Sequence, residues 1–182
     1  MHNHSDSLCF AKYNCLKLAA REVAFDISSA EEVFAQLRTI KNPAEREHNL
    51  LMAKRYLDWL QSQKGLMPLE DRPAGKFRAP KLAFNVRLKP EIAYQTSDGT
   101  FVTYLWATKL PSLTTQAAGA GIWMLREELA KGKFQGAQFQ IRDLRNNRTF
   151  DESVMTNQSE SILNADLALL NAIWVATAPL AA

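Results

Sequence analysis

The stretch LAFNVRLKPEIAYQTSDGTFVTYLWAT, residues 82–108, decides the fold class of this chain. Residues 82–88 alternate apolar and polar side chains, which is the period-two pattern of a half-exposed strand. A second strand is predicted at residues 91–96, and the Asp-Gly pair that follows indicates a hairpin turn into a third strand at residues 101–108. Most of the third strand is apolar or aromatic on both faces, so we expect it to lie in the middle of a sheet.

Three helices are predicted before these strands. Residues 9–23 carry apolar side chains at alternating four- and three-residue steps, which places them on one helical face. Two serines and two glutamates within residues 28–32 form overlapping capping-box patterns, which indicate the start of a second helix. Pro43 opens a third helix, because its missing N–H has no partner at the first helical position in any case, and Gly65 ends it. Residues 1–65 are therefore expected to be a helical part.

Two helices and two further strands are predicted after the central strand. Residues 112–131 form a helix capped by Ser112, and the small residues of its first turns let its backbone lie close to a sheet. Residues 137–142 alternate as a fourth strand, and a short return strand follows at residues 148–150. Residues 158–176 form a final helix that carries two neighbouring apolar stripes.

Length, composition and the order of these elements predict one α+β domain. A chain of 182 residues with 47% apolar and 23% charged side chains has the balance of an ordinary globular protein. The domain is expected to comprise the helical part (residues 1–65), an extended connector rich in Pro and Gly (residues 66–80), and a sheet with two helices (residues 81–182). We expect a small mixed sheet of four to five strands in the order strand, strand, strand, helix, strand, packed by helices.

The sequence contains no sign of membrane insertion or export. No segment offers the roughly 20 consecutive apolar residues that span a bilayer. Residues 8–20 lack the positive start and the uninterrupted apolar stretch of a secretory signal. We therefore expect a cytoplasmic protein with no membrane partner, in which Cys9 and Cys15 are free thiols. None of the three histidines stands at zinc-ligand spacing with a cysteine pair.

Two acidic residues stand out by their position. Glu91 begins the second strand, and Asp143 continues the alternation of the fourth strand, so its side chain is expected on the apolar face. The structural interpretation is that each carboxylate is either solvated or paired with an arginine, and for a buried carboxylate this partner would be Arg87, Arg142 or Arg145. The alternative is that each carboxylate is a ligand for a divalent metal.

The order helix, three strands, helix, strand over residues 45–145 resembles the core of the PD-(D/E)XK nuclease-like superfamily. In that superfamily an acid on the second strand and an acid-x-Lys motif on the third bind magnesium and position a water. Glu91 falls near the first acid, and Lys109 lies just past the third strand. Residues 103–107 of that strand contain no carboxylate, so the resemblance implies a relative that binds nucleic acid without cleaving it. An active enzyme would use Glu91 with Lys109 or Asp143 and Mg²⁺ or Mn²⁺.

Charge is distributed unevenly along the chain. From Arg72 to Arg148 there are 13 Lys or Arg and 5 Asp or Glu, a balance of +8, whereas the rest of the chain has 9 and 14, a balance of −5. A basic face beside acidic helices would attract phosphate backbones or an acidic protein. The alternative is that these Lys and Arg residues only make the exposed faces of the strands soluble. The predicted phosphate contacts are six cations in succession, Arg72, Lys76, Arg78, Lys81, Arg87 and Lys89. Nearby aromatic residues would stack on bases if exposed, namely Phe77, Tyr94, Tyr104 and Trp106.

Three functions follow from these observations. The leading prediction is a non-enzymatic binding protein that contacts nucleic acid or an acidic protein through the basic region and needs no cofactor. The first alternative is the divalent-metal-dependent nuclease-like enzyme. The second alternative is a structural homodimer, whose contact surface would be one stripe of the final helix, made of Leu163, Leu167, Leu170 and Trp174.

Overall fold

The computed structural model describes residues 14–26, 28–78, 82, 84–108 and 110–177. The helices are α2 (Asn14–Ala24), α3 (Ala30–Arg38), α4 (Pro43–Ser62), α5 (Thr115–Leu129) and α6 (Ser159–Thr177), with short 3-10 turns η1 (Gly132–Phe134) and η2 (Glu152–Val154). The strands are β1 (Met67–Pro68), β2 (Gly75–Phe77), β3 (Val86–Leu88), β4 (Ile92–Thr96), β5 (Gly99–Trp106), β6 (Gln138–Asp143) and β7 (Arg148–Phe150). No described helix is long and apolar enough to cross a bilayer.

The main sheet has five strands in the order β1-β4-β5-β6-β7. Strands β5 and β6 run parallel and are connected through α5, whereas the other neighbours are antiparallel. Strand β5 is hydrogen-bonded to both β4 and β6, as its two apolar faces predicted. The prediction of an α+β fold with a mixed sheet, followed by a closing helix, is confirmed.

The helix starts agree with the capping signals in two of three places. Ser29 caps α3 and exchanges hydrogen bonds with Glu32 in a complete capping box. Asn42 caps α4, directly before the proline. Helix α5 is capped by Thr114 rather than by the predicted Ser112. Thr114 has the extended backbone of an N-cap, and Leu113 before it is buried in the second core.

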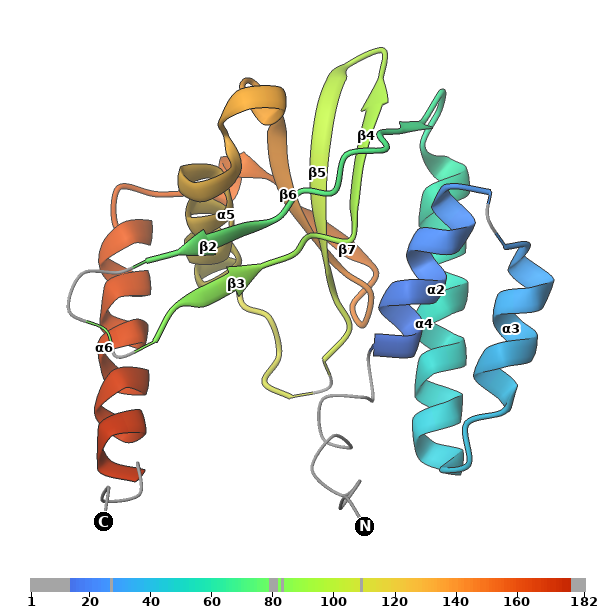
Figure 1. Ribbon diagram of the computed structural model, residues 1–182, viewed down its shortest axis with the longest axis horizontal. Helices are drawn as coiled ribbons and strands as arrows, with labels where there is room; N and C mark the ends of the chain where they lie inside the picture. Colours follow the sequence, from blue (N-terminus) through green and yellow to red (C-terminus); the bar gives the residue numbers. More distant parts are fainter. Residues whose placement is uncertain (1–13, 27, 79–81, 83, 109, 178–182) are drawn as a thin grey trace, which may run out of the picture.

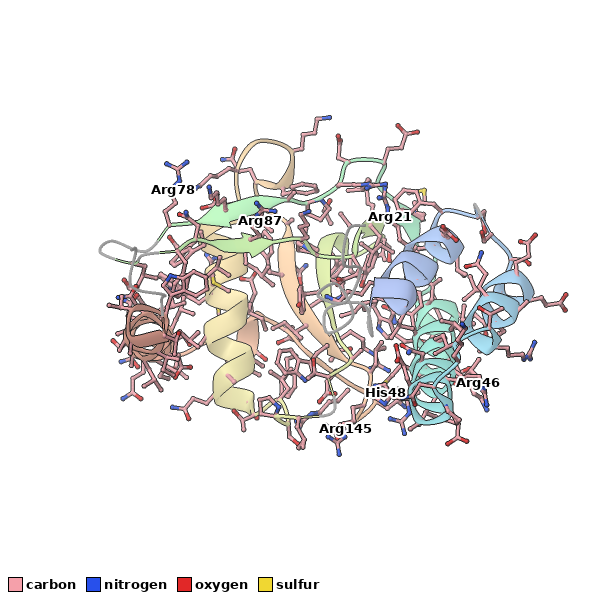
Figure 2. All side chains as sticks on the ribbon, turned by 60° about the horizontal axis from the view of Figure 1, so that its bottom comes forward. Arg21, Arg46, His48, Arg78, Arg87 and Arg145 are labelled. Atoms are coloured by element: carbon pink, nitrogen blue, oxygen red, sulfur yellow. The ribbon has the colours of Figure 1, made fainter. Side chains whose placement is uncertain are left out.

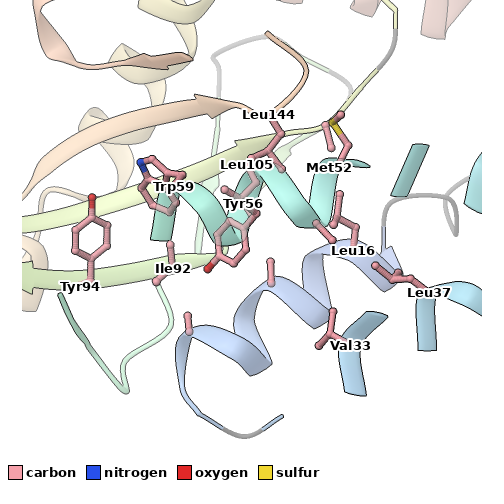
Figure 3. Packing of buried hydrophobic residues seen from close by; sticks show 14 residues of the cluster. Leu16, Val33, Leu37, Met52, Tyr56, Trp59, Ile92, Tyr94, Leu105 and Leu144 are labelled. Carbon is pink, nitrogen blue, oxygen red and sulfur yellow. The ribbon is translucent and has the colours of Figure 1, made fainter. Parts of the chain in front are cut away.

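Helices cover both faces of the main sheet (Figure 1). Helices α2, α3 and α4 pack on one face, where Tyr56 and Trp59 of α4 meet Tyr94 of β4 in the first core (Figure 3). Helix α5 covers the other face, where Val102 and Phe139 are fully buried in a second core. The sheet is therefore the middle layer of the fold.

The predicted connector, residues 66–80, contains two strands that the sequence pattern did not reveal. Strand β1 adds to the edge of the main sheet, and β2 pairs with β3 as a separate antiparallel ribbon. Both strands are only two or three residues long, which is too short for a periodicity signal. Gly75 lets the ribbon lie against α5, because a Cβ atom there would stand 2.6 Å from the Cγ atom of Glu128.

Candidate anion-binding site

A buried ion pair joins α2 to the start of β4. The Glu91 side chain is only 5% exposed, and its Oε1 lies 2.7 Å from Nζ of Lys17. Its other oxygen accepts a 2.6 Å hydrogen bond from the backbone N–H of Leu105 on β5. Lys17 also donates to the hydroxyl of Tyr104 at 3.2 Å. The partner of Glu91 is thus a lysine from the first helical layer, and the expectation of an arginine is wrong.

Each member of the pair changes the proton affinity of the other. Burial raises the pKa of Glu91 above its usual value, although the neighbouring Lys17 ammonium and the Leu105 N–H oppose this shift. Burial would lower the pKa of Lys17, but the Glu91 carboxylate and the Tyr104 oxygen together raise it above its usual value. Lys17 therefore carries a firmly held positive charge at the edge of the first core.

A cavity of about 540 Å³ opens beside this pair. Helix α2, the segment between β1 and β2, and the segment between β3 and β4 supply its lining, which consists of Lys17, Arg21, Arg72, Pro73, Ala74, Lys89, Pro90 and Glu91. Four of these side chains are cationic and one is a carboxylate, so the lining has a formal charge of +3. We call this the cationic cavity. Its size is that of a small-molecule site, and its charge suits an anion.

The β2–β3 ribbon carries the rest of the predicted basic surface. Lys76 and Arg87 are direct partners across the ribbon, and both are exposed. The neighbouring positions turn inward, where Phe77 and Val86 pack on the α5 side of the fold. Arg78 and Arg87 lie on the same side of the molecule as Arg21 in Figure 2. The outer face of the ribbon is therefore basic and its inner face is apolar.

The six predicted phosphate contacts fall into three groups. Arg72 and Lys89 line the cationic cavity. Lys76, Arg78 and Arg87 belong to the ribbon or directly follow it. Lys81 lies outside the described residues. Within the described part of the chain, no ion pair engages any of the five described cations.

Lys76 and Arg78 also line a second hollow, of about 440 Å³, together with two acids. Glu127 and Glu128 of α5 contribute to this hollow, and the Glu128 carboxylate accepts from the backbone N–H of Lys76 at 3.4 Å. These acids reduce the positive potential at this end of the ribbon. The strongest positive field in the basic region is therefore expected at the cationic cavity.

Asp143 is held in a different network on the α5 face of β6. It is fully buried and accepts from the backbone and side-chain nitrogens of Asn146 at 3.1 and 2.7 Å. Asp143 is paired with an arginine, as expected, but this arginine is Arg148 at 3.3 Å and not Arg87, Arg142 or Arg145. The hairpin turn between β6 and β7 brings Arg148 opposite Asp143, which sequence spacing alone did not single out.

The two acids of the nuclease-like alternative are held in two different ion pairs. Glu91 is bound by Lys17 and Leu105, while Asp143 is bound by Asn146 and Arg148. Among the described residues, no group of three or more His, Cys, Asp or Glu side chains is arranged so that it could hold a metal ion. Lys109 lies outside the described residues.

The aromatic residues near the basic region are not exposed stacking platforms. Tyr94 is buried, and its hydroxyl accepts a 2.7 Å hydrogen bond from Gln140. Phe77, Tyr104 and Trp106 are half-buried against the second core. Contacts with a ligand at this surface would thus depend mainly on charge.

Comparison with protein-family models, with curated proteins and with solved structures finds no match to this chain. The residues of the cationic cavity and the ribbon are therefore the basis for the proposal that follows.

Proposed function

We propose that this protein binds nucleic acid through the cationic cavity and the basic face of the β2–β3 ribbon, without cleaving it. The observation that carries the proposal is the direct cross-strand pairing of Lys76 with Arg87. Like charges at directly opposed positions destabilise a strand pair by about 0.2–1 kcal/mol. A phosphate backbone would relieve this repulsion, because its negative charge would lie close to both cations. The release of condensed counterions from the nucleic acid would add to the affinity.

The cationic cavity extends the same surface beyond the ribbon. Lys89 follows β3 directly and lines the cavity together with Arg72, so positive charge continues from the ribbon towards α2. A strand on this surface would meet Arg87 first and the cavity next. An acidic protein would use the same cations, but it lacks the regular spacing of charge along a nucleic acid.

The test is fluorescence anisotropy with labelled single- and double-stranded DNA and RNA at low and physiological salt. We expect log K to fall linearly with log salt concentration, with a slope of about −0.7 to −0.9 per contacted phosphate. Arg72→Ala and Arg87→Ala should each weaken binding and reduce this slope. Lys54→Ala on α4 is the control, because Lys54 is also exposed but lies on another element. Absence of binding at low salt, or equal effects of all three substitutions, would refute the proposal.

The same samples test the nuclease-like alternative. Incubation with Mg²⁺ or Mn²⁺ should leave the nucleic acid intact if Glu91 acts only as the partner of Lys17. Metal-dependent cleavage that Glu91→Gln abolishes would replace the binding proposal by the enzymatic one.

A second candidate function is self-association through the end of α6. Leu163 and Leu167 are buried against α5, whereas Leu170 and Trp174 are more than half exposed. The predicted stripe therefore divides along the helix into a buried first half and an exposed second half. Leu169, Ile173 and Val175 are also more than half exposed, and residues 167–177 carry no charge.

A second copy of the chain is the occupant that this surface fits. The other large apolar side chains that are exposed in the described chain are Leu51, Met67 and Leu110, which lie on separate elements. Another α6 is thus the one described surface that offers a matching apolar, uncharged face. Light scattering after size exclusion should give about twice the chain mass of 20.5 kDa. Leu170→Lys should give a monomer and Leu51→Lys should not; a monomeric wild type would exclude this candidate.

A further inference from the structure

We infer that the cationic cavity binds a phosphomonoester, the terminal phosphate of a nucleic-acid strand, in preference to an internal phosphodiester. This inference rests on the proposed nucleic-acid binding and specifies what one part of that surface recognises. It follows from the charge of the cavity, the donors that line it and its size.

The charge of the cavity favours a phosphomonoester over an internal phosphodiester. The lining has a formal charge of +3, because Glu91 offsets one of the four cations Lys17, Arg21, Arg72 and Lys89. An internal phosphodiester carries one negative charge, whereas a phosphomonoester carries about −1.5 to −2 at pH 7. The cavity therefore gains more electrostatic energy from the end of a strand than from its interior.

The hydrogen-bond donors of the cavity also favour a phosphomonoester. A lysine ammonium has three N–H groups, of which Glu91 and Tyr104 accept two. The third is left for a ligand in the cavity that Lys17 lines. The guanidinium groups of Arg21 and Arg72 add forked donors from α2 and from the segment after β1. A phosphomonoester offers three terminal oxygens to such a donor set, and a phosphodiester offers two.

The buried carboxylate of Glu91 fixes the position of the Lys17 ammonium before an anion binds. Glu91 holds the Lys17 ammonium through a 2.7 Å contact, and the Leu105 N–H fixes the carboxylate in turn. Lys17 thus loses little side-chain freedom when an anion binds, unlike an unrestrained surface lysine. The cavity volume of about 540 Å³ accommodates a terminal nucleotide, while the adjoining ribbon is available for the nucleotides that follow.

The experiment compares three oligonucleotides of one sequence that carry a 5′-phosphate, a 3′-phosphate or only hydroxyl ends. At pH 7.5 we expect one phosphorylated oligonucleotide to bind about tenfold more tightly than the hydroxyl-ended one, as one additional charge-assisted hydrogen bond would supply. At pH 5.5 the preference should decrease, because the second pKa of a phosphomonoester is about 6. Arg72→Ala should remove the preference, so that all three strands bind equally and more weakly than the hydroxyl-ended strand binds to the wild type. Arg87→Ala should weaken all three strands equally.

Lys17→Met tests the donor argument and should also remove the preference. Arg72 is exposed, so Arg72→Ala keeps the test decisive if Lys17→Met does not fold. Equal affinity for all three strands would overturn the inference and leave the proposed nucleic-acid binding intact, whereas no binding of any strand would overturn the proposed function. A mononucleotide that competes at the same concentration as the phosphorylated strand would show that the cavity binds free nucleotides. A mononucleotide that competes only at higher concentration would support binding of a strand end.

Discussion

The ammonium of Lys17 lies 2.7 Å from the carboxylate of Glu91, and this contact connects helix α2 to the sheet at the edge of the cationic cavity. The pair has two consequences. It fixes a positive charge where an anion would bind, and it gives the N-terminal helical layer a polar attachment in addition to its apolar packing. Stability and the proposed ligand binding would therefore depend on the same two side chains.

The two substitutions that break this pair should lower the free energy of unfolding by different amounts. Lys17→Met leaves a buried carboxylate without its cation and is expected to cost about 3 kcal/mol at pH 8. Glu91→Gln leaves a lysine that still reaches solvent and the Tyr104 hydroxyl, and should cost about 1 kcal/mol. Urea unfolding of both variants and of the double variant measures the coupling energy. Lys54→Met is the control, and equal costs for Lys17→Met and Lys54→Met would contradict this role of the pair.

The cost of Lys17→Met should decrease as the pH falls. Without Lys17, burial raises the folded-state pKa of Glu91 further above its unfolded value. A carboxyl group with a raised folded pKa favours the folded state below its unfolded pKa, and this contribution is lost as the pH rises through the folded pKa. Urea unfolding at pH 5 and pH 8 should thus show a smaller difference from wild type at pH 5. A difference that does not change with pH would show that Glu91 is not the titrating group.

Two glycines of α5 should respond in opposite ways to alanine. A Cβ atom on Gly119 would stand 2.5 Å from the carbonyl oxygen of Val154, so Gly119→Ala should cost about 1–3 kcal/mol through overpacking. At Gly121 the nearest atom is the flexible end of Ile141 at 3.0 Å. Because alanine gains about 1 kcal/mol over glycine in a helix, Gly121→Ala should be nearly neutral or stabilising. Urea midpoints with unchanged m-values test this, and equal midpoints for the two variants would refute it.

Arg87→Thr should stabilise the ribbon and weaken binding of nucleic acid. The substitution removes a like charge opposite Lys76 and introduces a side chain that favours strands, which is expected to contribute about 0.2–1 kcal/mol. Hydrogen exchange of the ribbon amides measures the local stability, and anisotropy measures the affinity. Lys64→Thr is a control for the loss of an exposed charge elsewhere. Tighter binding together with slower exchange would contradict the proposed role of this pair.

Local signals allowed most elements to be predicted from the sequence. The capping box at Ser29, the proline at the start of α4 and the Asp-Gly hairpin between β4 and β5 each depend on a few adjacent residues. Strands β1 and β2 could not be predicted, because they exist only through pairing with strands that follow them along the chain.

The candidate site was only partly predictable for a similar reason. The run of cations that includes Arg72 and Lys89 was visible as composition. Lys17 had no distinguishing pattern, since it is one polar position beside an apolar helical stripe, and its role depends on a partner far along the chain. The exposure of the second half of α6 was also hidden, because its stripes continue unchanged past the point where contact with α5 ends.

Because the β2–β3 ribbon is separate from the main sheet, its outward side chains can be substituted without loss of the fold. Within the described chain, the ribbon strands form ladder hydrogen bonds with each other and not with the main sheet, so the ladder of the five-stranded sheet does not depend on them. Its outward residues, such as Lys76 and Arg87, contribute nothing to the two main cores. Substitutions at these positions would therefore change the charge of this surface, and with it the proposed ligand preference, while the scaffold around the cavity stays the same.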